Sequence, residues 1–197
     1  MDTTFTLDMT MMFAYHDALR RDLQHVTAMT ARSAGWDLFT RFLHAHHDAE
    51  DQALWPVARR HLAGHPEDLA VLDEMEHQHA ALGPLLVGID AALDRGELSL
   101  AARHELAVLL VEHLAAEEER ALRVIDRTLD VEQWMQFGEA GAARIGPHMP
   151  SFLPWLLDGA DAERTSAILS HLAEPAQLTY RSAWRPAYAA RDWWAAS

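Results

Sequence analysis

The chain of 197 residues contains no cysteine. Disulfides, thiolate nucleophiles, iron–sulfur clusters and thiolate zinc sites are therefore excluded. Basic residues are also scarce, because 16 Lys and Arg stand against 30 Asp and Glu, which gives a formal net charge of -14. Binding to nucleic acid or to an anionic membrane requires clustered basic residues, so we expect neither as a partner.

Long hydrophobic runs are missing as well. No stretch approaches the length needed to cross a bilayer, and the N-terminus carries Asp2 and Asp8 where a secretory signal has a basic start and an apolar run. These features lead us to expect a cytoplasmic protein. Half of the residues are hydrophobic, which is enough for a proper core.

The hydrophobic pattern is that of helices. Apolar residues recur at spacings of three and four, as in Leu19, Leu23 and Val26, and no sustained alternating pattern is present. We therefore expect an all-α protein in which Pro84 kinks one helix. The predicted helices cover residues 9–30, 35–62, 67–94, 99–128, 131–143, 162–172 and 176–188.

Two parts are expected along the chain. Residues 1–130 should form an up-down-up-down antiparallel four-helix bundle, and residues 131–197 a helical extension rich in tryptophan. Because large aromatic side chains are usually buried, we expect the extension to pack on the bundle. Alternatively, the extension forms a lid or the contact surface of a homodimer.

Each predicted bundle helix carries a histidine near its middle: His16, His46, His79 and His113. In an antiparallel bundle, two residues at the same depth on consecutive helices lie equally far from the loop between them. The midpoints between these histidines fall in or beside residues 30–35, 64–66 and 94–99, and each of these segments contains turn or capping residues. The four histidines should therefore meet at one depth.

Two of these histidines have a carboxylate on the same helix face. Glu50 follows His46 by four residues, and Glu117 follows His113 by four. Residues four apart project from one face, so each pair can bind one metal and bridge to another. The sequence thus predicts a two-metal centre inside the bundle, with these ligands: His16, His46, Glu50, His79, His113 and Glu117.

Helix phase leaves three neighbouring residues as alternatives. His47 could replace His46, but only His46 lies four before Glu50, so we expect His47 beside a ligand or on the surface. Glu118 could replace Glu117, although the four-residue spacing favours Glu117. Glu76 lies three residues before His79 and is either a further ligand or an ordinary surface carboxylate.

These motifs resemble the hemerythrin-like (HHE cation-binding) domain family, over roughly residues 10–125. The similar stretches are His16-Asp-Ala-Leu-Arg-Arg, His46-His-Asp-Ala-Glu-Asp-Gln-Ala-Leu-Trp-Pro56 and His113-Leu-Ala-Ala-Glu-Glu. The resemblance implies two iron ions, bridged by carboxylates and by an oxo or hydroxo group. Imidazole and carboxylate ligands alone would also suit zinc or manganese, so the expectation of iron depends on the resemblance.

The resemblance also implies a function, which is the binding of dioxygen, or of peroxide or nitric oxide, at a non-haem di-iron site. Oxygen carriers of the family place two histidines four apart on the third helix, whereas here Met75 lies four before His79. A missing histidine leaves open metal positions, which favours an alternative function as a peroxidase, a catalase-like protein, a nitric-oxide reductase or an oxygenase of a small substrate. A second alternative is an iron or oxygen sensor, or a scaffold holding a metal without redox chemistry.

Overall fold

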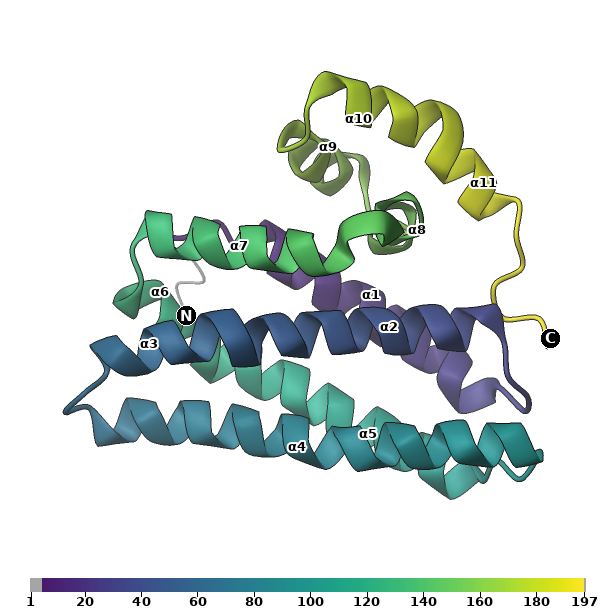
Figure 1. Cartoon of the computed structure of the whole chain (residues 1–197), viewed down its shortest axis with the longest axis horizontal. Helices are drawn as coiled ribbons and strands as arrows, with labels where there is room; N and C mark the ends of the chain where they lie inside the picture. The colour runs from purple at the N-terminus through teal and green to yellow at the C-terminus, as the bar shows by residue number, and fades with distance from the viewer. Residues whose placement is uncertain (1–4, 197) are drawn as a thin grey trace.

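The computed structural model describes residues 5–196. Within these residues, an isolated bridge between Ser33 and Ala196 is the sole β-type pairing, and the predicted all-α fold is confirmed. Figure 1 shows long helical rods packed side by side as a bundle, with the C-terminal part of the chain lying along one side of it.

The four rods follow the predicted up-down-up-down order. They are α1 (Thr10–Ala28); α2 (Ala34–Ala49) with η1 (Glu50–Leu54) and α3 (Trp55–His61); α4 (Pro66–Arg95); and α5 (Leu100–Ala116) with η2 (Glu117–Ala121) and α6 (Leu122–Thr128). The caps are those that the sequence suggests, because the side chains of Ser33 and Ser99 accept backbone hydrogen bonds at the starts of α2 and α5. Gly96 ends α4 at φ +67°, a left-handed conformation that favours glycine.

Two features inside the rods concern the regularity of the helices. α4 continues as one helix through Pro84, and the kink expected there stays a prediction. The second and fourth rods each contain a π-helical turn, η1 and η2, and each turn begins at a glutamate of the predicted metal centre, Glu50 or Glu117. A π turn inserts one residue into the helical repeat and is frequent at functional sites.

The rest of the chain is also helical. It comprises α7 (Val131–Ile145), η3 (Gly146–His148), α8 (Met149–Leu156), α9 (Ala162–Ser170), α10 (Glu174–Thr179), η4 (Tyr180–Trp184) and α11 (Arg185–Ala189). The helix α8 was not predicted, because its prolines indicate a loop. Pro150 lies in the first turn, where its missing N–H has no helical partner to lose, and the apolar side chains of α8 are buried.

The extension shares a hydrophobic core with the bundle. Phe152 and Trp155 of α8 lie in one buried cluster with Leu19 of α1 and Phe42 of α2. This packing agrees with the expected position of the extension. The division of the chain at residue 130 into two units stays a prediction, as do the lid and the homodimer.

The C-terminal residues run from α11 to the end of the bundle where α2 begins, and they contact the start of α2 (Figure 1). The backbone N–H of Gly35 donates to the carbonyl of Trp193 at 2.5 Å. The Trp194 ring stacks on the exposed His25 ring, with centroids 5.0 Å apart. The last residues therefore tie the extension to the loop between α1 and α2.

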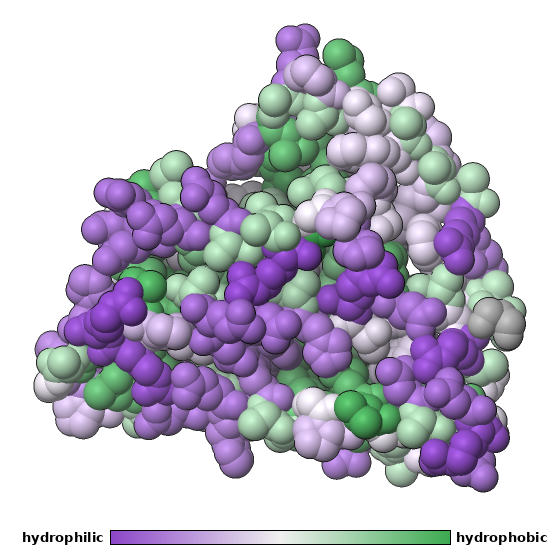
Figure 2. All heavy atoms as spheres, in the orientation of Figure 1, coloured by the Kyte–Doolittle hydropathy of each residue, from purple (hydrophilic) through white to green (hydrophobic). Residues whose placement is uncertain are grey.

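The outer faces of the bundle are polar. Figure 2 shows mainly hydrophilic residues over the helices on this face, with hydrophobic residues in smaller separate groups. Ion pairs such as Arg120 with Glu74 and Arg127 with Asp68 join neighbouring helices at the surface. None of the helices in the described part of the chain combines the length and hydropathy required to cross a membrane.

Candidate metal centre

Seven buried side chains converge inside the bundle: His16, His46, His47, Glu50, His79, His113 and Glu117. They form two groups that share Glu50. One group consists of His16, His46, Glu50 and Glu117, and the other of His47, Glu50, His79 and His113. Within each group the potential ligand atoms lie within 4.8 Å of one another, which is the arrangement of a candidate two-metal centre.

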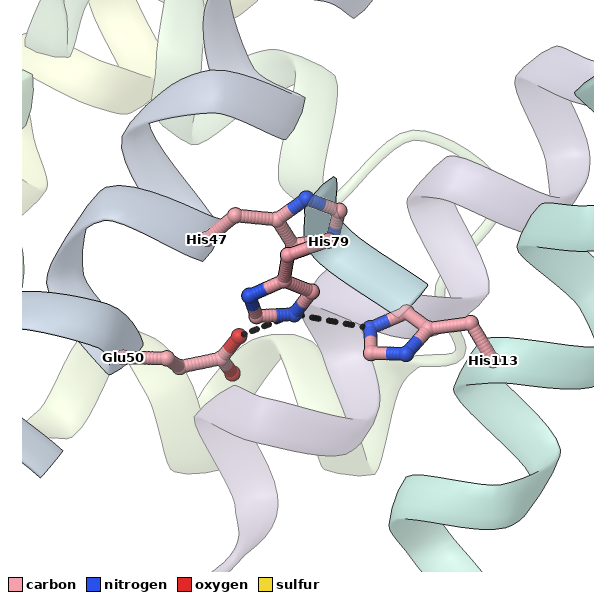
Figure 3. Close-up of side chains that lie close together, drawn as sticks. All are labelled: His47, Glu50, His79 and His113. Carbon is pink, nitrogen blue, oxygen red and sulfur yellow. Dashed lines mark hydrogen bonds and ion pairs between the residues drawn. The ribbon is translucent and has the colours of Figure 1, made fainter. Parts of the chain in front are cut away.

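The distances between the histidines fit metal coordination. Nε2 of His16 and Nε2 of His46 lie 3.1 Å apart, and the Nε2 atoms of His79 and His113 are also 3.1 Å apart (Figure 3). Two nitrogens that each lie about 2.1 Å from one metal ion, at right angles, are about 3 Å apart. Each pair of histidines can therefore bind one ion at adjacent positions.

The two glutamates lie between the groups. Glu50 Oε1 is 3.3 Å from Nε2 of His46, while its Oε2 is 3.5 Å from Nε2 of His79. Glu117 Oε2 is 3.2 Å from Nε2 of His16 and 3.8 Å from Nε2 of His113. Each carboxylate thus contacts a histidine of both groups, which is the position of a bridging ligand.

The bridging carboxylates are fully buried, and all four of their oxygens lack a hydrogen-bond donor. Nε2 of His47 is likewise buried without a partner. Burying an unsatisfied charged group costs several kcal/mol, and native proteins avoid it by pairing the charge or by coordinating a metal. Glu50 belongs to both groups, Glu117 to one and His47 to the other, so the unpartnered residues fit a pair of cations.

Polar groups outside the centre fix three of the histidine rings. Nδ1 of His16 donates to Glu118 at 2.8 Å, and Nδ1 of His79 donates to Asp51 at 2.8 Å. Nδ1 of His113 donates to the side-chain oxygen of Gln78 at 2.9 Å. A proton held on Nδ1 leaves the lone pair on Nε2 directed at the centre, as in established histidine metal sites.

A pseudo-twofold axis relates the two halves of the centre. Asp51 in one half and Glu118 in the other are each the second residue of a π-helical turn. The symmetry is broken by His47, which stacks on His79 with ring centroids 4.0 Å apart and gives this group a third imidazole. In the other group, the ring of Tyr15 stacks on His46 at 4.6 Å. The position beside His16 and His46 therefore has fewer imidazole ligands.

In the absence of bound cations, the buried groups perturb one another's pKa values. Burial opposes protonation of His16, but Glu117 and Glu118 outweigh it and raise the pKa of His16 to about 9. Burial lowers the pKa of His113 to about 4, and it also lowers the pKa of His46 and His47 well below the usual range. Neutral imidazoles are the form that binds a metal.

The two carboxyl groups shift in opposite directions. Burial and the nearby Glu117 raise the pKa of Glu50 well above its usual value. Burial would also raise the pKa of Glu117, but the adjacent His16 has the stronger effect and lowers the pKa of this carboxyl group. Such opposed shifts are typical of two like charges in one dry site, where ionising both is costly without a cation.

The structure brings together the six residues of the predicted ligand set and sorts the three alternatives. Glu118 lies outside the centre as the partner of His16. Glu76 bonds to Arg59 on the surface, as an ordinary surface carboxylate. His47 lies inside the cluster together with His46, which differs from the expectation that it stands beside a ligand or on the surface.

A signal for His47 was present in the sequence. Neighbouring helical residues are rotated by about 100°, and a centre of two metals is wide enough for both to reach it. One face of a helix can therefore supply a ligand to each ion. His47 from α2 thereby adds a third imidazole to the group of His79 and His113.

This fold and this set of side chains define a class, that of helical bundles with a histidine and carboxylate cation-binding centre. The model of the hemerythrin HHE cation-binding domain matches residues 8–125, a range that contains every residue of the cluster. The match covers more than half of the chain, and the chain belongs to this family, as its motifs predicted. No curated protein and no solved structure matches it.

Proposed function

We propose that this protein is a non-haem di-iron protein that binds dioxygen, with peroxide and nitric oxide as alternative ligands. The observation that carries the proposal is the pair of buried carboxylates, Glu50 and Glu117, whose oxygens have no donor and lie among five imidazoles. Mixed nitrogen and oxygen ligands suit iron, zinc and manganese alike, and membership of the hemerythrin family favours iron.

Each part of the centre has a distinct role in this proposal. Glu50 and Glu117 hold the two ions together, while Asp51, Gln78 and Glu118 keep histidine lone pairs aimed inward. A bound pair of ferrous ions supplies two electrons, one from each ion, for the binding of dioxygen. The position beside His16 and His46 has two imidazoles where the other has three, and it is where we expect the exogenous ligand.

The buried surroundings support binding of a small ligand. Tyr15 covers the His46 ring, and its hydroxyl donates to the carbonyl of Phe42 at 2.8 Å, so this hydroxyl is directed at the backbone. Phe42 itself is fully buried. A dry, apolar wall excludes bulk water and protects a bound diatomic molecule from side reactions.

Turnover as a di-iron oxidoreductase is the second candidate, and the asymmetry of the centre favours it over a purely structural site. His47 gives one position three imidazoles, so open coordination is concentrated at the His16 and His46 position. A position with fewer imidazoles suits either reversible binding or reduction of peroxide. Stable, reversible oxygenation supports a carrier or sensor, and steady consumption of peroxide, nitric oxide or a small organic substrate supports an enzyme.

Metal analysis combined with visible spectroscopy tests the proposal. The protein is purified without added metal, analysed, and its spectrum recorded before and after anaerobic reduction and re-exposure to air. We expect two irons per chain, with charge-transfer absorption that bleaches on reduction and returns in air. Zinc in place of iron, or no metal after reconstitution with ferrous iron, would contradict the proposal and leave a scaffold role.

A further inference from the structure

A series of buried aromatic rings leads away from the candidate metal centre. The ring of Tyr15, stacked on His46, lies edge-on to the ring of Trp155 in α8, with centroids 5.4 Å apart. Trp155 is fully buried and also contacts Phe42, at 4.8 Å. The extension thus places its most deeply buried tryptophan one ring away from a histidine of the centre.

The indole of Trp155 has an unusual partner for a core residue. Its N–H donates to the carboxylate of Asp22 at 2.6 Å, and Asp22 is itself only 3% exposed. The guanidinium group of Arg21 lies 5.8 Å from the indole ring, donates to Asp22 at 3.0 Å, and donates to the carbonyl of Asp158 at 2.8 Å. A buried carboxylate is costly, and this one contacts none of the groups of the metal centre.

The same polar groups connect Trp155 with the surface. Tyr188 of α11 is half-buried and packs against the hydrophobic cluster that contains Trp155. Arg21, which donates to both Asp22 and the carbonyl of Asp158, connects the indole partner with the cleft that Asp158 and Tyr188 line. The ring of Tyr188 stacks on that of Trp193, with centroids 4.8 Å apart. The rings of Tyr188 and Trp193 both line an open cleft of about 880 Å³ between α8, α9 and α11.

We propose that Tyr15, Trp155 and Tyr188 form a route for electrons between the metal centre and this surface cleft. The inference rests on the proposed function, because it requires a redox-active metal. Tyrosine and tryptophan are the side chains most easily oxidised without a thiol, and this chain has no cysteine. A series of short steps between such rings carries an electron much faster than one long step through an apolar core.

Asp22 gives the route its chemical balance. When Trp155 loses one electron towards the oxidised centre, its indole N–H proton moves to the Asp22 carboxylate, so the products are a neutral indole radical and a neutral carboxylic acid and no cation radical is left in the core. The proton returns when an electron arrives from Tyr188. Hydrogen peroxide as oxidant takes up two electrons and two protons and becomes two water molecules, and a one-electron donor at the cleft replaces the electrons and releases the protons.

The cleft favours a donor that carries negative charge. Three arginines, Arg181, Arg185 and Arg191, line it against one acidic residue, Asp158. The guanidinium group of Arg191 lies 4.4 Å from the centre of the Trp193 ring. The chain as a whole is strongly acidic, so this local concentration of positive charge stands out. Ascorbate is a small anionic reductant of the required class.

Trp36 provides a matched control. It is also fully buried, and its indole N–H also donates to an aspartate, Asp90, at 2.7 Å. Its ring packs on Phe39 near the start of α2 and has no contact with a histidine of the centre among the described residues. Trp155→Phe and Trp36→Phe thus remove the same chemical group from equally buried positions.

The first test identifies which residues are oxidised when peroxide reacts at the metal centre. Iron-loaded protein receives a small excess of hydrogen peroxide without an external donor, and peptide mass spectrometry measures oxygen added at Trp193 and Tyr188. We expect oxidation there in the wild type and in Trp36→Phe, and a several-fold loss in Trp155→Phe with more oxidation at Tyr15. Zinc-loaded protein should show little oxidation at either residue.

A second measurement follows electrons that enter from an external donor and reduce the metal centre. Ascorbate is mixed with the ferric protein under anaerobic conditions, and the decay of the charge-transfer band is followed. We expect Trp155→Phe and Asp22→Asn to slow this reduction several-fold, with Trp36→Phe unchanged. Asp22→Asn keeps the shape of the side chain but cannot take up the proton, so it tests the route even if Trp155→Phe does not fold.

Equal oxidation patterns and equal reduction rates in these variants and in the wild type would overturn the route. If the wild type binds no iron, the proposed function itself fails, and the metal analysis reveals this. If iron binds and peroxide is consumed while the variants behave alike, only the route fails. The two failures are therefore distinguishable.

Discussion

Glu118 on one side of the bundle accepts a hydrogen bond from Nδ1 of His16 on another helix, at 2.8 Å. The same carboxylate oxygen accepts from Arg20 at 2.7 Å, so the pair belongs to a partly buried network. Across the pseudo-twofold axis, Asp51 holds His79 in the same way. In both cases a π-helical turn brings the acidic residue after the bridging glutamate to the outer nitrogen of a histidine.

Removing this outer hydrogen bond should weaken metal binding. We expect Glu118→Ala to lower the affinity for iron by about 10–100-fold, because the His16 ring loses the group that fixes its orientation and its protonated nitrogen. Titration of metal-free protein with ferrous iron measures the change. Glu119→Ala is the control, since Glu119 is an exposed neighbour of the same charge. Equal affinities in the two variants would argue against an orienting role for Glu118.

Replacing the carboxylate of Glu50 should stabilise the metal-free protein and weaken its binding of metal. In Glu50→Gln a neutral amide replaces a fully buried carboxyl group beside Glu117, so we expect the metal-free protein to gain about 1–3 kcal/mol in free energy of unfolding. The same change removes a ligand that both metal groups share, and iron content should fall sharply.

Urea unfolding with and without iron measures both effects of the Glu50 substitution. The control is Glu76→Gln, which removes a carboxylate that bonds to Arg59 on the surface. This control should bind iron normally and change stability by less than about 1 kcal/mol. Retention of the full iron content by Glu50→Gln would show that Glu50 is not the shared ligand.

His47 distinguishes a centre with five imidazoles from one with four. We expect His47→Ala to lose iron preferentially from the position formed with His79 and His113, so that occupancy falls towards one ion per chain. The change should leave the fold intact, as circular dichroism can verify. His77→Ala, at an exposed position on α4, should keep both ions. Two firmly bound ions in His47→Ala would restore the four-histidine set that the spacing rule predicted.

On the acid side of neutrality, the metal-free protein should lose stability as the pH falls. The pKa of His113 is about 4 in the fold against 6.5 for a free imidazole, and the pKa values of His46 and His47 shift in the same direction. Between these values the unfolded chain binds protons that the folded protein does not. Stability therefore rises with pH up to about 6.5, as unfolding of chelator-treated protein should show.

On the alkaline side, the same protein should lose stability as the pH rises. His16 keeps its proton to about pH 9 beside Glu117, so its contribution is complete below pH 6.5 and lost as the pH passes through about 9. This contribution is on the order of 3 kcal/mol. Glu50, whose pKa is raised, acts in the same direction. We expect a stability maximum near pH 6.5, and Glu117→Gln should flatten the alkaline limb.

The bundle and most of the candidate centre could be predicted because both depend on local regularities. Equal distances from the loops placed His16, His46, His79 and His113 at one depth, and the four-residue spacing placed Glu50 and Glu117 beside them. These rules need only helix geometry and antiparallel packing. The turns fell where the midpoints predicted, between the four rods.

The remaining features depend on contacts that no local pattern contains. The π-helical turns at Glu50 and Glu117 alter the helical phase, and periodicity assumes a constant phase. His47 was ranked below His46 because only His46 lies four residues before Glu50, and that rule does not foresee two neighbouring residues reaching one centre. The prolines of α8 indicate a loop, and the burial of Phe152 and Trp155 against the bundle overrides that local signal.

The contact between Gly35 and the C-terminal tryptophans can be tested by adding one methyl group. A Cβ atom at Gly35 would lie 2.6 Å from the Trp194 ring and 2.9 Å from the Trp193 carbonyl, too close for either to remain in place. We expect Gly35→Ala to cost about 1–3 kcal/mol in free energy of unfolding, because the tail must detach or α2 must shift. Thermal unfolding measures the stability, and tryptophan fluorescence reports the exposure of the tail.

Gly88→Ala is the matched control, because Gly88 lies on the exposed face of α4 with nothing within 4 Å of an added Cβ. Alanine is favoured over glycine inside a helix, so this variant should gain about 0.5–1 kcal/mol. If the tail packs on α2 in solution, glycine-to-alanine substitution lowers the free energy of unfolding at Gly35 and raises it at Gly88. A gain in stability for Gly35→Ala would mean that Trp193 and Trp194 do not rest there, and that other contacts of the extension, such as the α8 core, hold it on the bundle.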